Sequence, residues 1–100
     1  MVLAAAIAKI SNGKIFTEWF DGSTFNIGLV RNQLHHFLSE KLFLTTNNNC
    51  VNMGNFDIHF VREKSCVYSC IVNSGGNKHF IGGLLQNLME DFEDVHLLCI

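Results

Sequence analysis

The sequence predicts an α+β domain: a five-stranded, mainly antiparallel sheet with helices on both faces, in the chain order β-β-α-β-β-β-α. Three observations support this prediction. The segments at residues 2–8 and 66–72 are apolar on both strand faces. Two other segments, near residues 25–44 and 81–92, carry apolar residues at helical spacing. Because a sheet with two apolar faces must be covered on both sides, we place the helices on opposite faces.

The composition describes one globular domain and excludes several function classes. A chain of 100 residues with 48% hydrophobic and 16% charged residues can bury one core. A net charge of −2 without a lysine or arginine cluster argues against nucleic-acid binding. The apolar start lacks a preceding positive charge and ends at Lys9. It therefore fits neither a secretory signal nor a spanning helix, which needs roughly 20 apolar residues.

The first two strands are expected to form a hairpin. A turn at residues 11–14, Ser-Asn-Gly-Lys, separates the first strand from a second strand at residues 15–20. Asn-Gly is favoured in two-residue hairpin turns, where both central residues need positive φ. We therefore expect a tight hairpin that is buried within the domain.

The first helix is expected from near Phe25 to about Leu44. Capping residues at 21–24, Asp-Gly-Ser-Thr, precede it, and a polar run at 45–49 follows it. The core-facing stripe at helical spacing consists of Ile27, Val30, Leu34, Phe37, Leu38 and Lys41, whose stem can lie along the stripe.

The second half of the chain supplies three strands and the last helix. Cys50 and Val51 begin a short strand, residues 56–60 alternate as a half-buried strand does, and residues 66–72 form a central strand. After a glycine-containing loop, an amphipathic helix is indicated by Ile81, Leu84, Leu85, Leu88, Met89 and Phe92.

Four segments of the chain, in order and at compatible spacing, resemble one known family. They are MVLAAAIAKISNG (residues 1–13), GNFDIHF (54–60), CVYSC (66–70) and LLQNLMEDF (84–92). Together they resemble the longin domain, the N-terminal regulatory module of the longer R-SNAREs. The chain is most similar to the ER–Golgi branch of the synaptobrevin/longin family. The resemblance implies a longin (profilin-like) fold for residues 1–94.

The family's fold continues into a third helix, a heptad-patterned SNARE motif and a transmembrane segment, which this sequence does not contain. Residues 95–100 form an apolar tail instead. The resemblance thus implies a domain that is incomplete at its C-terminus. We expect its last helix to be under-protected and its stability to increase on extension or partner binding.

The resemblance implies a protein-binding module in vesicle-mediated transport between ER and Golgi, at the cytosolic face of those membranes. Its partners would be trafficking proteins, namely SNARE segments and coat or tethering components, and membrane association would be indirect. In the family, partner segments enter a groove between the first helix and the third strand. Mapped onto this sequence, the groove involves Leu38, Leu42, Phe43, Cys50, Val51 and Met53. The alternative is a small-subunit-type longin domain of a vesicle coat or adaptor complex.

The residue pattern adds a second candidate surface on the first helix. An outward stripe at roughly heptad spacing consists of Phe25, Leu29, His36 and Phe43. Apolar residues on the solvent side of a helix tend to mark a contact surface, while scattered exposure is also common.

No catalytic, cofactor or metal site is expected. The sequence has no glycine-rich phosphate loop, no Gly-x-Ser-x-Gly elbow and no Cys-x-x-Cys pair. His35 and His36 are adjacent on a helix and point about 100° apart, so they cannot share a metal. His59 is expected to be a partly exposed structural histidine.

The four cysteines are expected to be reduced, as in cytosolic proteins. Cys66 and Cys70 are expected in the core, as is Tyr68. A small redox or metal enzyme is the third hypothesis, and it rests only on the thiols and histidines.

Overall fold

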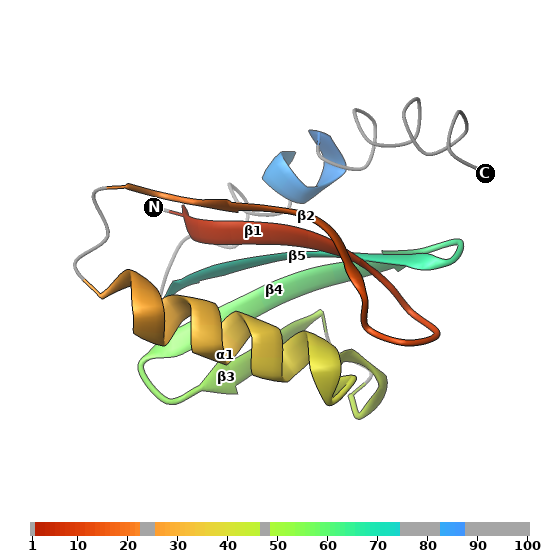
Figure 1. The fold of residues 1–100 in the computed structure, drawn as a ribbon, viewed down its shortest axis with the longest axis horizontal. Coiled ribbons are helices and arrows are strands. Elements are labelled where there is room, and N and C mark those ends of the chain that lie inside the picture. Colours follow the sequence, from red (N-terminus) through yellow and green to blue (C-terminus); the bar gives the residue numbers. More distant parts are fainter. Residues whose placement is uncertain (1, 23–25, 47–48, 75–82, 88–100) are drawn as a thin grey trace.

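The computed structural model describes residues 2–22, 26–46, 49–74 and 83–87 (Figure 1). Residues 83–87 form a short helical segment. The other elements, in chain order, are β1 (Val2–Lys9), β2 (Ile15–Phe20), α1 (Ile27–Ser39), the 3₁₀ helix η1 (Leu42–Leu44), β3 (Cys50–Met53), β4 (Phe56–Glu63) and β5 (Cys66–Asn73).

The predicted five-stranded antiparallel sheet is confirmed. Its strand order is β2-β1-β5-β4-β3, and every neighbouring pair is antiparallel. β1 and β5, the two strands with apolar residues on both faces, lie side by side and are buried along their length except for the last residue of each. The edges are β2 and β3.

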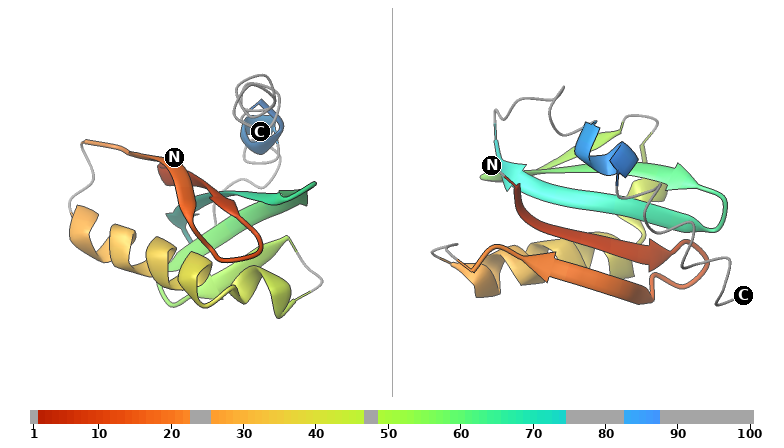
Figure 2. Two further views of the ribbon diagram at one scale, coloured as in Figure 1. Left: turned by 45° about the vertical axis from the view of Figure 1, so that its right-hand side comes forward. Right: turned by 90° about the horizontal axis from the view of Figure 1, so that it is seen from above.

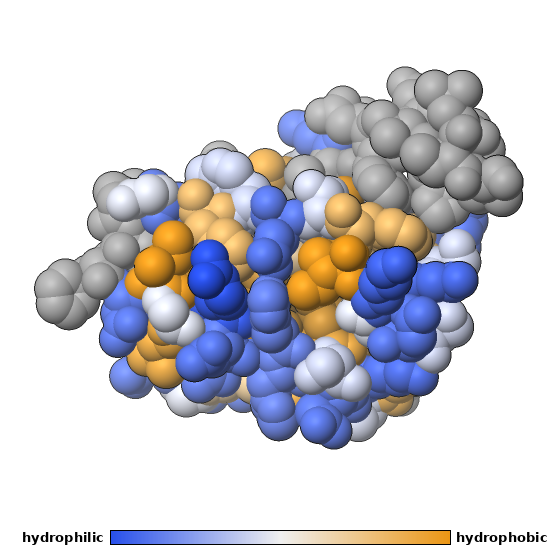
Figure 3. Space-filling model, in the orientation of Figure 1, coloured by the Kyte–Doolittle hydropathy of each residue, from blue (hydrophilic) through white to orange (hydrophobic). Residues whose placement is uncertain are grey.

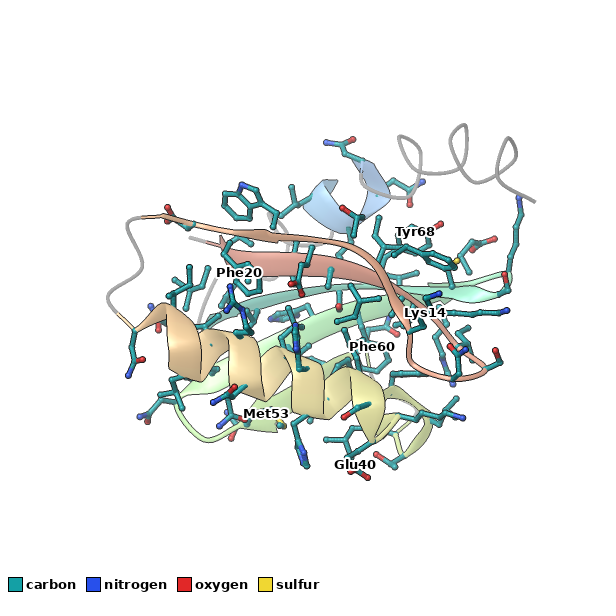
Figure 4. All side chains as sticks on the ribbon, in the orientation of Figure 1. Lys14, Phe20, Glu40, Met53, Phe60 and Tyr68 are labelled. Carbon is teal, nitrogen blue, oxygen red and sulfur yellow. The ribbon has the colours of Figure 1, made fainter. Side chains whose placement is uncertain are left out.

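Apolar side chains form two clusters, one on each face of the sheet. Figures 1 and 2 show α1 on one side of the sheet and the short helical segment 83–87 on the other. On one face, Leu34 and Phe37 of α1 pack against alanines of β1 and apolar residues of β4 and β5. On the other face, Leu85 of the short helical segment packs against β1 and β5. Figure 4 shows the division, with Phe60 projecting toward α1 and Tyr68 away from it. The remainder of the predicted last helix lies outside the described residues.

The first helix is shorter than predicted at its C-terminal end. It ends at Ser39, and Lys41 has a positive φ of 53°, which a continuing α-helix does not permit. The chain then forms η1, which turns Phe43 back into the core, where its ring centroid lies 5.9 Å from that of Phe37. The prediction that the helix continues to Leu44 was wrong because tertiary packing of Phe43 outweighs helical propensity.

The N-terminal end of α1 also differs from the prediction. Its cap is Asn26, whose Oδ1 accepts a hydrogen bond from the Leu29 N–H at 3.2 Å. Ile27, predicted to face the core, is 37% exposed, whereas Val30, the next residue of the predicted stripe, is buried. Phe25 lies outside the described residues.

The β1–β2 connection is a wider loop than the predicted two-residue turn. Gly13 has φ +71°, but Asn12 is not in the positive-φ region. The Gly13 N–H donates to the Lys9 carbonyl, and the Asn12 side chain accepts from the Lys14 N–H at 2.9 Å. The loop packs against the end of α1, because a Cβ atom on Gly13 would lie 2.5 Å from the Leu38 carbonyl oxygen.

Candidate functional site

The predicted groove residues lie at two depths. Leu38 and Phe43 are fully buried, at 0% exposure. Leu42, Val51 and Met53 are half-buried and pack against the core on the α1 side of the sheet. A partner can therefore touch only the last three without rearranging the core.

Cys50 does not belong to this surface. Side chains alternate along a strand, so Cys50 projects to the face opposite that of Val51. Its Sγ atom lies 3.8 Å from Nε2 of His59, its register partner on β4. Cys50 was predicted to line the groove together with Val51, whereas in the structure its side chain lies on the other face of the sheet. A four-residue strand gives too short a pattern to predict this orientation.

Of the predicted outward stripe on α1, two residues are described and exposed. Leu29 is 41% exposed and His36 is also exposed, seven positions further along the same helix. Phe43 is buried, because the helix ends before it. Figure 3 shows apolar surface on this side of the molecule in separate patches, with hydrophilic side chains between them.

Two large aromatic side chains are exposed on β2, a strand that was expected to be buried. Phe16 is 46% and Trp19 is 54% exposed, because β2 is an edge strand and only its two terminal residues are half-buried. Thr17 and Glu18, polar residues in the middle of the strand, are the sequence signal that indicated exposure. On the α1 side, Glu18 Oε2 lies 2.6 Å from His35 Nε2 and links β2 to the helix.

The structure also brings together three potential metal ligands that the sequence analysis treated separately. One ligand atom each from Cys50, Asp57 and His59 lie within 4.8 Å of one another. Cys50 and Asp57 are half-buried, and His59 is buried at 7% exposure, so its predicted partial exposure was wrong. The available signal was the Gly54 turn between β3 and β4, since a hairpin there places Cys50 opposite His59.

Neighbouring side chains orient the Asp57 carboxylate. Asn52, the register partner of Asp57, donates from Nδ2 to Asp57 Oδ1 at 2.8 Å. The Ser74 hydroxyl donates to the same oxygen at 3.3 Å, and Asn52 Nδ2 lies 2.9 Å from Ser74 Oγ. The carboxylate is therefore held on the side of the sheet that carries Cys50 and His59.

The buried thiols are poor nucleophiles at neutral pH. Burial raises the pKa of the Cys70 thiol from an ordinary value of 9.0 to about 12, and electrostatic repulsion from Cys50 adds to the shift. Burial also raises the pKa of Cys66, against opposing effects of a Ser65 hydrogen bond and of Lys9. Cys50, Cys66 and Cys70 form no disulfide, and Cys99 lies outside the described residues. These shifts leave little thiolate on Cys66 or Cys70 for covalent chemistry.

No protein-family model matches the chain, and no curated protein matches it. Within the described ranges, no helix combines the length and the apolar character needed to cross a bilayer.

Proposed function

We propose that the chain is a longin-type protein-binding module that acts in vesicle-mediated transport between ER and Golgi, at the cytosolic face of those membranes. One observation carries the proposal: segments 1–13 and 66–70, which carry the sequence resemblance, contribute the adjacent central strands β1 and β5. The five-stranded antiparallel sheet is also compatible with the longin fold that the resemblance implies. In this proposal the chain is a binding protein and not an enzyme.

The docking surface in this proposal is smaller than the groove that the sequence predicted. It comprises Leu42, Val51 and Met53, beside the free edge of β3. An edge strand offers backbone groups to an added strand, and alternate side chains supply specificity. A SNARE segment bound in extended form would pair with β3 and cover Val51 and Met53 with its apolar side chains.

Titration of the chain with SNARE-motif peptides, followed by NMR chemical shifts, tests this proposal. We expect the shifts to centre on β3 and η1, and Val51→Lys to weaken binding at least about tenfold, a loss of about 1.4 kcal/mol. Leu29→Lys is the matched control, because Leu29 is exposed on α1 and is not one of the three residues of this surface. Equal effects of the two variants, or no binding of any such peptide, would contradict the proposal.

The coat or adaptor alternative is favoured by two exposed aromatic residues on the edge strand β2. Phe16 and Trp19 expose large aromatic side chains along β2, and aromatic residues are enriched in the cores of stable interfaces. A permanent complex would cover both residues. Co-purification of the tagged chain with a stoichiometric partner, lost in Trp19→Lys but retained in Val51→Lys, would favour this alternative over transient SNARE binding.

A further inference from the structure

The β3–β4 hairpin creates a ligand arrangement that is absent from the linear sequence. The Phe60 N–H donates to the Asn49 carbonyl at 2.9 Å, so these two residues form a hydrogen-bonded pair. Pairs alternate along an antiparallel ladder, which makes Cys50 and His59 a non-hydrogen-bonded pair with closer side chains. Asp57 follows on the same face, two positions from His59.

We propose that Cys50, Asp57 and His59 bind a zinc ion on the sheet face opposite α1. In a tetrahedral zinc site with a thiolate and an imidazole, the sulfur and nitrogen lie about 3.5 Å apart. The Cys50 Sγ to His59 Nε2 distance is 3.8 Å, and all three ligand atoms lie within 4.8 Å of one another. Small side-chain rotations therefore bring the three atoms onto one ion.

The donor set selects the metal. A thiolate, an imidazole and a carboxylate suit zinc, whereas calcium and magnesium require oxygen ligands. Solvent completes the fourth position, since Cys50 and Asp57 are only half-buried. On binding, the Cys50 sulfur–hydrogen bond breaks, the sulfur electron pair is donated to zinc, and the proton passes to solvent.

Neighbouring residues orient the ligands through hydrogen bonds, as they do in known zinc sites. Hydrogen bonds from Asn52 and Ser74 fix the Asp57 carboxylate, and such outer contacts orient ligands and strengthen metal binding. β4 lies between β3 and β5, so His59 is held on a strand that is paired on both sides. The site lies on the face of the sheet opposite Val51 and Met53, the β3 side chains of the proposed docking surface.

Cobalt titration of the reduced, chelator-treated chain tests the site. We expect one equivalent of Co²⁺ to produce a thiolate-to-cobalt charge-transfer band, and Zn²⁺ to abolish it by displacement. Cys50→Ser should remove the band, and Asn52→Ala should weaken zinc binding about tenfold through the loss of carboxylate orientation. Cys66→Ser, a cysteine on β5 outside the cluster, is the control and should retain the band.

The opposite results overturn the proposal. A wild-type chain without the band, or a band that survives Cys50→Ser, would exclude this site, as would loss of the band in Cys66→Ser alone. A second measurement needs no variant: Zn²⁺ should shift the His59 imidazole signals in the NMR spectrum of the wild-type chain. Unshifted His59 signals at saturating Zn²⁺ would also refute the site.

Discussion

Gly13 meets two requirements that no other residue type satisfies together. Its φ of +71° is in the left-handed region, and a Cβ atom would lie 2.5 Å from the Leu38 carbonyl oxygen. The contact joins the β1–β2 loop to the end of α1, where Lys41 Nζ also donates to the Ser11 carbonyl at 2.5 Å. One glycine thus fixes how closely the hairpin approaches the helix.

Gly13→Ala should lower the free energy of unfolding by at least about 2 kcal/mol, from backbone strain and the clash with Leu38. Gly54→Ala is the matched control, because Gly54 has φ +77° with open space around it. Its cost should be smaller, about 1–2 kcal/mol, from backbone strain alone. Urea unfolding measures both, and equal costs would show that the loop does not press on α1.

The Cys70 thiol should make stability fall at high pH. Its folded pKa of about 12 lies above the ordinary value of 9.0, so the unfolded state loses this proton first. The contribution of the protonated thiol to the free energy of unfolding is therefore complete below pH 9 and is lost as pH rises toward 12. Between pH 9 and 12, the free energy of unfolding of Cys70→Ala should therefore fall less steeply than that of the wild-type chain, by about 1.4 kcal/mol per pH unit.

Urea unfolding of both proteins at several pH values between 9 and 12 gives the two slopes. Cys66 is present in both proteins, so its own titration cancels in the comparison. Parallel declines would mean that Cys70 ionises equally easily in the folded and unfolded chains.

Among the elements, α1 illustrates what a sequence pattern can and cannot predict. Val30, Leu34, Phe37 and Leu38 were correctly assigned to the core, because helical spacing requires them to share a face. The helix end could not be predicted, since it depends on where Phe43 finds space between α1 and the sheet. The same limit applies to β3, where pairing with β4 decides which face Cys50 occupies.

Asn26 should contribute to α1 as its N-terminal cap. Asn26→Ala should cost about 1 kcal/mol, because the Leu29 N–H loses its side-chain acceptor. Asn26→Asp should preserve or slightly raise stability, because α1 has no acidic residue in its first turn to complement the helix dipole. Thermal unfolding distinguishes the two variants. An unchanged Tm in Asn26→Ala would show that the Asn26 side chain does not stabilise the helix as a cap.

At the scale of the whole molecule, the sheet was the most predictable part. β1 and β5 carry apolar residues on both faces, and only central strands bury both faces. The wide β1–β2 loop and the exposed β2 were missed, because each depends on contacts with segments distant in the sequence. The metal-ligand cluster was missed for the same reason: its members meet only through strand pairing.

Leu34 and Leu29 offer a direct comparison of core and surface within one helix. Leu34→Ala should lower the free energy of unfolding by about 2–5 kcal/mol, since Leu34 is 0% exposed in the α1-side core. Leu29→Ala should change it by less than about 0.5 kcal/mol, since Leu29 is 41% exposed. Both substitutions change helix propensity equally. The difference between their free energies of unfolding, measured by chemical denaturation, therefore reports the effect of side-chain burial. Similar losses of stability in the two variants would mean that α1 does not pack on the sheet through the face that carries Leu34.

The central pairing of β1 with β5 has a consequence for synthesis. Cys70 emerges 65 positions after its partner Ala5, a delay of about 3–13 s at a translation rate of about 5–20 residues per second. Throughout that interval the nascent β1–β2 hairpin holds an apolar strand with one edge unpaired. Such an edge recruits other strands, so aggregation competes with folding before β5 arrives. The yield of folded protein in cells should therefore depend on chaperones that bind the first twenty residues during translation.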